Sequence, residues 1–541
     1  MKKTLCIVLC LAMFFTLFTG CAKTPATDPD ANKDNTTTTT PDANKDNNTT
    51  TPDANKDNTT TPSGRTDINF AITSEPKTLT PFEIDEYTGF TVCYQLYDRL
   101  IEIESDGTVT PGLAESWELA PDSKSITFKL RQGVKFHNGD ELTAEDVVFT
   151  YDKAIASAVT AGVTSAMDHM EKVDDSTVKL VLKEAFAAAE SCVPFAQLSI
   201  ISKSAYEADP DAFARNPVGT GPYKFGSWEI GNKITLTAND DYYDGAPAIK
   251  DVTFKIILDT NTVVMAMQNG EVDICDTAPS AGRSTIENDK NLEWYACPSA
   301  GSNFIIFNNA KEPFNDKRVR QAVALALDKE SIVIGALEGD GEVAQTLMAR
   351  SVPQYPSDFV SAYDQQNIEK AKQLLADAGY PNGFDIVCPT MDSELFVPAT
   401  EMFQDMLAQI GINVTVEKYE RNVWLDKVRV QHDYQFCHMN TNASYPDADY
   451  LYPLFHSSYF GGKNWADVNL PELDKLLEEG RSESDPEKRN EIYAQIVQIM
   501  DDECVVAPIY NKNMGVAAAK GLQNVVPSAT RRLFINEYSW A

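Results

Sequence analysis

The sequence predicts an α/β fold with mixed sheets, built as two lobes behind an N-terminal leader. Strand-type and helix-type hydrophobic patterns alternate along the chain, without a long run of strands alone. Residues 66–541 are too many for a single hydrophobic core, because cores stop growing beyond roughly 250–300 residues. The preceding 65 residues contain an apolar run and a low-complexity stretch, and neither can contribute to that body.

The first 20 residues have the pattern of a secretory signal peptide. Lys2 and Lys3 precede an almost wholly apolar run from Leu5 to Phe18. This run is shorter than the roughly 20 residues of a membrane span and fits a signal-peptide core of about 7–15 residues. The small residues before Cys21 resemble a bacterial lipoprotein signal. We therefore expect residues 1–20 to be removed and Cys21 to be lipidated, with secretion without a lipid as the alternative.

Residues 21–65 are expected to form a lipid-anchored, disordered linker. The unit PDANKDN occurs at 29–35, 41–47 and 52–58, separated by threonine runs. Such a segment has almost no large apolar side chains and cannot offset its ordering entropy by burial. A flexible coil of this length reaches roughly 35 Å, enough to hold a folded body above the outer face of the cytoplasmic membrane.

Charge and cysteine content narrow the class of protein. The formal net charge is −34, so nucleic acid is not an expected partner. The chain has ten cysteines, of which Cys6 and Cys10 lie in the predicted signal peptide. The seven cysteines after Cys21 contain no C-x-x-C pair, which argues against a zinc ribbon or a thioredoxin-type site. We expect most of them to be small buried hydrophobic residues.

Hydrophobic periodicity predicts individual elements within the body. Strands are predicted from alternating apolar residues at 126–130, 178–182, 252–256 and 412–416, and a buried strand is predicted from the apolar run at 504–510. Helices are predicted after Thr143, over 319–327, from Asn367 to Gly379, over 402–410 up to Gly411, and from Pro486.

Catalytic motifs are scarce. The chain has no H-E-x-x-H and no G-x-S-x-G. Residues 339–344 match G-x-G-x-x-A but follow a predicted helix, whereas a dinucleotide site needs a preceding strand. His432, Cys437 and His438 do not have the spacing of a metal site. We therefore expect no catalytic residues, no metal and no cofactor, and the protein is not expected to be an enzyme.

Several long segments resemble one protein family. They include SEPKTLTPFE at 74–83, NPVGTGPYKF at 216–225 and the stretch from PGLAESWELAPDSK to AEDVVFTYD at 111–152. Further matching segments lie at 313–333 and 363–384. Together they are similar to the extracytoplasmic solute-binding proteins of peptide-type ABC transporters, the bacterial solute-binding family 5 with dipeptide-, oligopeptide- and nickel-binding members. The resemblance covers nearly all of residues 66–541.

The resemblance implies a periplasmic-binding-protein-like fold of three domains in two lobes. Lobe I is expected at about 66–98, 200–300 and 506–541, an inserted domain II at about 99–199, and lobe III at about 301–505. Residues 301–307 and 505–510 resemble the strands that cross between the lobes. Ligand is expected in the cleft between the lobes, which close over it by a hinge motion.

The resemblance also implies a function and a set of ligand contacts. The protein is expected to be a monomeric extracellular lipoprotein that captures peptides and delivers them to an ABC permease. The expected ligand-binding residues are Thr80, Tyr87, Asn440, Thr441, Asn442, Ser444, Tyr445 and Asp447. In peptide-binding members an aspartate in G-W-x-x-D-Y-P-D-P binds the ligand's ammonium, and in dipeptide binders an arginine binds its carboxylate.

This chain departs from that pattern at both positions. Ser444 occupies the aspartate position, and no arginine lies near Met391 or Asp392. An ammonium buried without a carboxylate would be strongly disfavoured. Asp447 or Asp449 could replace the missing aspartate, but Asp447 could equally be a turn residue after Pro446.

Two other classes of ligand and two other classes of protein stay open. The family also contains binders of oligosaccharides and metal chelates. A sugar site would suit the aromatic and amide residues expected near the cleft, which are Tyr87, Trp424, Asn440, Asn442, Tyr445 and Trp465. Outside the family's transport role, the alternatives are a surface hydrolase, which would turn over its ligand, and a peptide-signal receptor, whose loss would leave uptake unchanged.

Overall fold

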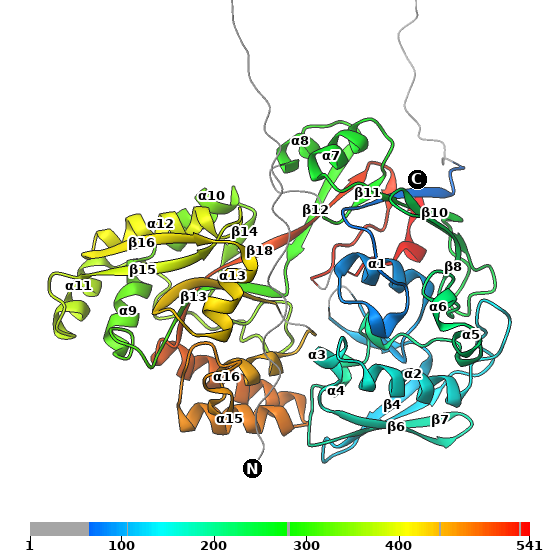
Figure 1. Ribbon diagram of the computed structural model, residues 1–541, viewed down its shortest axis with the longest axis horizontal. Coiled ribbons are helices and arrows are strands. Elements are labelled where there is room, and N and C mark those ends of the chain that lie inside the picture. The colour runs from blue at the N-terminus through cyan, green and yellow to red at the C-terminus, as the bar shows by residue number, and fades with distance from the viewer. Residues whose placement is uncertain (1–63, 105–106, 278–281, 443–444, 530–531) are drawn as a thin grey trace, which may run out of the picture. The chain divides into compact units, whose positions relative to one another are not determined.

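The computed structural model describes residues 64–104, 107–277, 282–442, 445–529 and 532–541. The predicted signal peptide, the lipidated Cys21, nearly all of the linker and Ser444 therefore lie outside the described residues. The described part is a mixed α/β fold with several sheets, which confirms the predicted fold class (Figure 1).

The largest sheet has ten strands and is mixed. Its order is β17-β13-β18-β11-β1-β10-β9-β8, and β12 and β14 pair with β18. Strand β1 runs parallel to β10 and β11, whereas the other pairs in this sheet are antiparallel. The strands are β1 (Asp67–Ile72), β8 (Tyr223–Glu229), β9 (Lys233–Ala238), β10 (Asp251–Ile256), β11 (Ile274–Cys275), β12 (Leu292–Pro298), β13 (Gly301–Phe307), β14 (Gly341–Val343), β17 (Phe436–Asn442) and β18 (Val506–Ala519).

Strand β18 is longer than the sequence predicts. The expected strand ended at Tyr510, but the structure continues it for nine residues. Asn511, Lys512 and Asn513 show no apolar alternation, so the periodicity gave no signal there. Hydrogen bonding to β14 and β12 holds this polar segment, since Lys512 lies opposite Gly341 and Asn513 opposite Pro298. The predicted end of this strand was therefore wrong, because pairing with segments distant in sequence, rather than a hydrophobic pattern, determines the strand beyond Tyr510.

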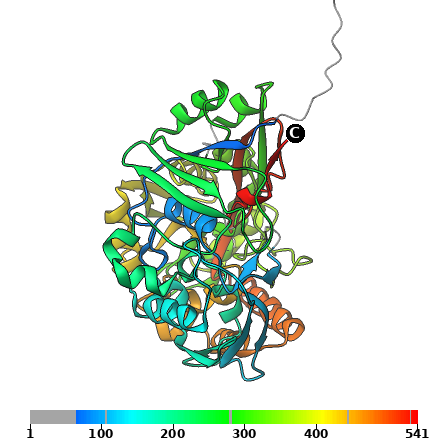
Figure 2. The same cartoon turned by 90° about the vertical axis from the view of Figure 1, so that its right-hand side faces the viewer.

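Smaller sheets complete the β structure. An antiparallel sheet has the order β4-β5-β7-β6, and α2 packs on it, as the turned view also shows (Figure 2). Its β5 and β7 confirm the predicted strands at 126–130 and 178–182. The strands of the smaller sheets are β2 (Ile101–Ile103), β3 (Val109–Pro111), β4 (Ala114–Leu119), β5 (Ser125–Leu130), β6 (Met167–Asp174), β7 (Thr177–Leu182), β15 (Phe384–Met391), β16 (Ile412–Tyr419), β19 (Leu522–Gln523) and β20 (Ser539–Trp540).

The predicted helices are confirmed, with ends shifted by a few residues. Thr143 forms a reciprocal capping box with Asp146, and the Asn367 side chain accepts a hydrogen bond from Lys370. The α-helices are α1 (Tyr87–Leu96), α2 (Ala144–Ala156), α3 (Ala161–Thr164), α4 (Ala189–Cys192), α5 (Lys203–Ala208), α6 (Pro210–Phe213), α7 (Thr260–Gln268), α8 (Arg283–Glu287), α9 (Lys317–Ala326), α10 (Lys329–Leu337), α11 (Ile368–Asp377), α12 (Val397–Ala408), α13 (Arg421–Leu425), α14 (Leu451–Phe455), α15 (Pro471–Ser482) and α16 (Pro486–Asp502).

Short 3-10 and π turns connect several of these elements. They are η1 (Pro81–Glu83), η2 (Ala196–Leu198), η4 (Asp426–Val430), η5 (Ala448–Tyr450), η6 (Ser457–Tyr459) and η7 (Ile535–Glu537). The π turn η4 directly follows α13 and leads toward β17.

Two large hydrophobic cores organise the described residues. One contains buried residues between Phe304 and Tyr510. The other contains residues between Ile68 and Ile274, together with Tyr445 and residues near the C-terminus. Strand β18 belongs to both, because Tyr510 lies in the first core and Val516 in the second. The crossing strand thus connects the two cores, while the predicted domain boundaries remain a prediction.

Cysteine placement agrees with the sequence interpretation. The seven cysteines of the described part are unpaired, and all are buried except Cys297, which is half-buried. Within the described ranges, we find no helix that is both long enough and apolar enough for a membrane span.

Candidate ligand-binding site

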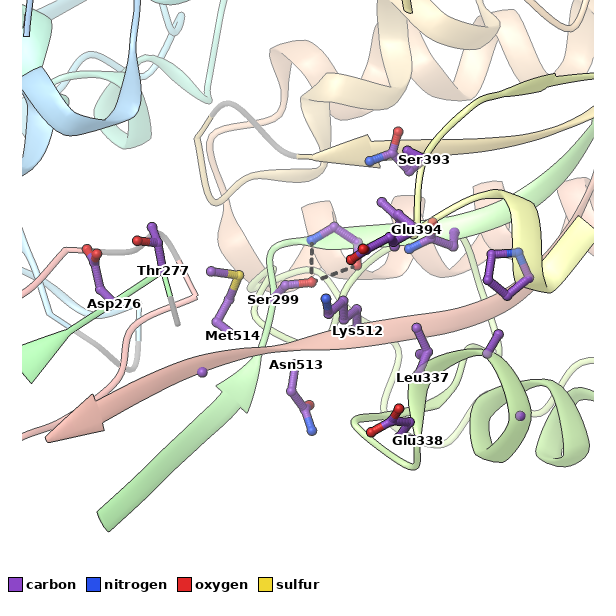
Figure 3. Close-up of a pocket in the computed structure, with 18 of the residues that line it drawn as sticks. Asp276, Thr277, Ser299, Leu337, Glu338, Ser393, Glu394, Lys512, Asn513 and Met514 are labelled. Carbon is purple, nitrogen blue, oxygen red and sulfur yellow. Dashed lines mark hydrogen bonds between the residues drawn. The ribbon is translucent and has the colours of Figure 1, made fainter. Parts of the chain in front are cut away.

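A pocket of about 890 Å³ lies where β12, β13, β17 and β18 approach one another. Asp276 and Thr277 lie at one end, and Ser393 and Glu394 lie toward the other (Figure 3). Residues 512–515 of β18 run between these ends and line the pocket. The segment of β18 that the sequence did not predict as a strand is therefore the segment that forms this site.

Strand pairing fixes the amide side chains of the pocket. Asn303 of β13 lies directly opposite Asn440 of β17, and both residues line the pocket. The turn between β12 and β13 is held by Ser299, whose hydroxyl lies 3.3 Å from both the N–H and the carbonyl oxygen of Gly301. Two amide side chains are thus presented side by side from rigid strands.

Several buried polar atoms of this pocket have no hydrogen-bond partner in the described protein. They are Trp294 Nε1, Asn303 Oδ1 and Ser393 Oγ. Leaving such a group unpaired costs about 1–3 kcal/mol. An indole N–H donates, an amide oxygen accepts, and a hydroxyl can do either. The pocket therefore suits a ligand with neutral donors and acceptors.

Charged side chains lie among these neutral groups. Asp276 is buried at the pocket wall and accepts a hydrogen bond from the hydroxyl of Tyr87. Glu394 and Lys512 also line the pocket, and neither takes part in an ion pair with another described residue. The site can thus offer both a cation and a carboxylate to a ligand.

The structure brings some of the predicted contact residues to this pocket. Asn440 lines it, and Tyr87 reaches its wall through Asp276. Thr80 is fully buried at the start of η1 and Thr441 is buried within β17, and neither lines the pocket.

The two remaining polar positions of the predicted loop cannot be assigned contacts. Ser444 and the side chain of Asn442 lie outside the described part of the chain. Their expected roles in ligand binding stay predictions.

Asp447 is part of a buried ion pair. Its Oδ2 and Oδ1 accept hydrogen bonds of 2.5 Å and 2.6 Å from Nη1 and Nη2 of Arg489, and Oδ1 also accepts from the N–H of Asp449. Burial opposes the charge on Arg489, but the charge and hydrogen bonds of Asp447 raise the pKa of the guanidinium. Both carboxylate oxygens are engaged, so the expectation that Asp447 contacts ligand has no support in this geometry.

Tyr445 and Asp449 also face protein rather than the pocket. The Tyr445 hydroxyl donates to Oδ2 of Asp449 at 3.1 Å, and its ring packs edge-on against Phe186. Burial raises the pKa of Asp449 to about 6, although Arg481 at 4.0 Å opposes this shift. The loop after β17 is therefore anchored by buried polar contacts, and Asp449 is not one of the residues that line the pocket.

The histidines near β17 have structural partners. His432 places Nδ1 2.9 Å from Oδ1 of Asp467 and Nε2 2.9 Å from the carbonyl oxygen of Gly462. His438 is buried against the rings of Phe396 and Phe403, and this burial lowers its pKa to about 3. Among the described residues, no cluster of three or more His, Cys, Asp or Glu side chains has the geometry to hold a metal ion.

Sequence reasoning missed most of the pocket. Trp294, Ser393 and Lys512 belong to no motif, and three separate segments carry them. One signal was present: Ser302 and Asn303 directly precede the apolar run of β13, and both are buried. A buried polar residue in an apolar strand needs a partner, which points to a site.

An α/β fold with a pocket beside a strand that connects two cores is typical of extracellular solute-binding proteins. A family model described as bacterial extracellular solute-binding proteins, family 5, middle part, matches residues 108–462. The oligopeptide-binding protein AppA of Bacillus subtilis is 32% identical over 470 residues, which cover 82% of this chain and 86% of that protein.

Solved structures agree with this match. The structure of HbpA2 from Haemophilus parasuis is 27% identical, with a TM-score of 0.81, and covers 88% of this chain and 100% of its own. The structure of AppA from Bacillus subtilis in complex with a nonapeptide is 29% identical, with a TM-score of 0.69, and covers 89% and 100%.

The chain belongs to the bacterial extracellular solute-binding proteins of family 5. This confirms the resemblance found in the sequence and the periplasmic-binding-protein-like fold. The family consists of solute-binding proteins rather than enzymes.

Proposed function

We propose that this protein captures peptides in the pocket between β13, β17 and β18 and delivers them to an ABC permease. The observation that carries the proposal is the chemistry of the pocket. Neutral donors and acceptors and a lysine on strands converge there with carboxylates from the segments that follow β11 and β15. A peptide carries the partners of these groups: amide N–H and C=O groups for the neutral donors and acceptors, a carboxylate for the lysine and an ammonium for the carboxylates.

The edge of the large sheet supports a peptide ligand. Strand β17 is bonded to β13 on one side. Its other side forms no strand pair in the described sheet, but β15 packs beside it at His438, so the relevant edge is the segment near Asn440. Extended peptides bind such edges by adding a strand, so that main-chain hydrogen bonds give affinity. Asn440 lies on this edge strand and at the pocket. A peptide along β17 would therefore pass the unpaired polar atoms.

The ligand's charged ends have candidate partners. Lys512 can pair with a carboxylate, and Glu394 or Asp276 can pair with an ammonium. These carboxylates take the role that the aspartate has in the family pattern, where this chain has Ser444. Asp447 is already paired and is a poor replacement.

Relatives support the peptide class. AppA of Bacillus subtilis is named an oligopeptide-binding protein, and its solved structure holds a nonapeptide. We extend that ligand class to this chain. We also propose that Cys21 carries a lipid, that residues 21–65 tether the body to the outer face of the membrane, and that the lobe boundaries are those expected from the resemblance.

An oligosaccharide is the second candidate ligand. The indole of Trp294 and the amides of Asn303, Asn440 and Asn513 line the same pocket. Sugars are bound by such aromatic and amide groups. This candidate does not use the charged side chains of the pocket, which is why we rank it after peptides.

Mass spectrometry of ligand released from the purified, denatured protein tests the ligand class. We expect a family of short peptides. Oligosaccharides in the released fraction would replace the peptide proposal by the second candidate. Delivery to a permease is tested separately, because peptide uptake that is unchanged after deletion of the gene would contradict a transport role.

A further inference from the structure

Arg429 is a half-buried cation without an acidic partner among the described residues. It lies in η4, and its side chain is half-buried. Its Nε is buried and has no hydrogen-bond partner within the described residues. Its Nη2 donates one long hydrogen bond of 3.4 Å, to the carbonyl oxygen of Asn440. This is unexpected in a chain with 80 acidic and 46 basic residues, where carboxylates are plentiful.

Among the described residues, the other buried arginines have an acidic partner or several carbonyl acceptors, although Nε of Arg481 and Nε of Arg532 also lack a hydrogen-bond partner. Arg489 has the two oxygens of Asp447, and Arg99 has the carboxylate of Glu102. Arg320 has no acid, but its guanidinium donates to the carbonyl oxygens of Phe314, Glu503 and Cys504. Arg429 has neither arrangement, so most of its five donors remain available.

The surroundings hold Arg429 in position without neutralising it. Its Cζ lies 4.2 Å from the ring centroid of Trp465 and 5.8 Å from that of Trp424. Rings at this distance attract a cation and restrict its orientation. Burial lowers the pKa of Arg429, and the charge of Arg421 acts in the same direction. An anion bound to this guanidinium would relieve that unfavourable burial.

Arg429 does not line the pocket itself but contacts a residue that does. The residue that accepts its hydrogen bond, Asn440, lines the pocket and lies on the edge strand β17. A ligand that runs along β17 would therefore pass within reach of the guanidinium.

We infer that Arg429 binds a carboxylate of the ligand. This rests on the proposed function and adds the charge that the ligand must carry. A guanidinium binds a carboxylate through two parallel hydrogen bonds, which an ammonium cannot do. The carboxylate is the C-terminus of a peptide or, if the ligand is a sugar, the carboxylate of a uronic acid. Position 429 is distinct from positions 391–392, where the family's dipeptide binders carry their arginine.

Two peptide pools that differ only at the C-terminus test this inference. Each contains the same tetra- to hexapeptides without Asp or Glu, prepared either as free acids or as C-terminal amides. The refolded, ligand-stripped protein is incubated with equal amounts of both pools, and the retained peptides are quantified by mass spectrometry. A third pool contains neutral and uronic-acid oligosaccharides of matched length.

We expect the wild-type protein to retain free acids over amides by about tenfold or more, because hydrogen bonds to a charged group are strong. In Arg429→Gln this preference should fall to near one. Arg421→Gln removes an exposed cation eight residues earlier and should keep the wild-type preference. If Arg429→Gln does not fold, Arg429→Lys serves instead, because it keeps the charge but loses the two parallel donors of the guanidinium. Its preference for free acids over amides should fall at least threefold.

The outcomes distinguish the role of Arg429 from the proposed binding of peptides. Peptides retained with an unchanged acid preference in the Arg429 variants would overturn the role of Arg429 and leave the proposed function standing. Retention of uronic-acid oligosaccharides alone, lost in Arg429→Gln, would support the carboxylate site and overturn the peptide proposal. If the wild-type protein retains none of the pools, or only neutral sugars, both the carboxylate site at Arg429 and the peptide proposal are overturned.

Discussion

Arg489 and Arg429 lie in the same half of the molecule, and their surroundings differ in one respect. Arg489 is held by both oxygens of Asp447 and by the carbonyl oxygen of Gly480. Arg429 is stacked on Trp465 and makes one long hydrogen bond. Burial and charge are therefore poor guides to the role of an arginine. What differs between these two is that Asp447 neutralises Arg489, whereas no acidic residue of the described chain pairs with Arg429.

The largest expected effect is on stability, at the satisfied arginine. Arg489→Met leaves Asp447 buried without its partner, which should lower the free energy of unfolding by about 3–5 kcal/mol. Denaturant unfolding measures this change. Lys488→Met is a matched control, because Lys488 is 66% exposed and its ion pair with Asp485 should contribute at most about 1 kcal/mol. Equal losses in the two variants would contradict a structural role for Arg489.

A second effect depends on pH and concerns Asp449. Its pKa is raised to about 6 in the folded protein, so the folded state keeps a proton that the unfolded state releases near its ordinary value. The stability this group contributes is full below about pH 4 and falls as the pH rises to about 6.

We therefore expect Asp449→Asn to gain stability relative to wild type over this pH range, by up to about 2–3 kcal/mol. Unfolding free energies of the two proteins from pH 4 to pH 8 give the difference, which should level off above about pH 7. A difference that is the same at every pH would show that Asp449 titrates normally.

A smaller effect is expected on ligand affinity. Trp465→Leu removes the ring that positions Arg429, and peptide affinity should fall about 2- to 30-fold, in line with a cation–π contribution of about 0.5–2 kcal/mol. Isothermal titration with the free-acid peptide pool measures it. Trp228→Leu disrupts another arginine–tryptophan stack, on Arg215, and does not touch the pocket lining. A similar loss in this control would mean that the effect is not specific to Arg429.

The sequence predicts local structure well because local signals determine it. The helix after Thr143 and the helix from Pro486 carry caps and apolar stripes, and both occur as expected. The predicted strand ended before the end of β18, because the polar segment of β18 is held by hydrogen bonds to β12 and β14, which are distant in sequence. Pairing of this kind leaves no periodic trace.

The site was harder to predict for the same reason. The family pattern drew attention to Asp447, but its partner Arg489 is 42 residues away, and only the structure joins them. Lys512 and Trp294 reach the pocket from separate strands. Arg429 looks like one of many charged residues in the sequence. Only the structure shows that it has neither an acidic partner nor a set of carbonyl acceptors among the described residues.

Hydrogen exchange with and without the free-acid peptide pool tests most directly where the ligand binds. We expect the bound peptide to slow amide exchange in 436–442 of β17 and in 512–515 of β18. Exchange in 486–502, which carries Arg489, should stay unchanged. Protection of 486–502 with none in β17, in a protein shown to hold peptide, would contradict the assignment of the ligand to this pocket.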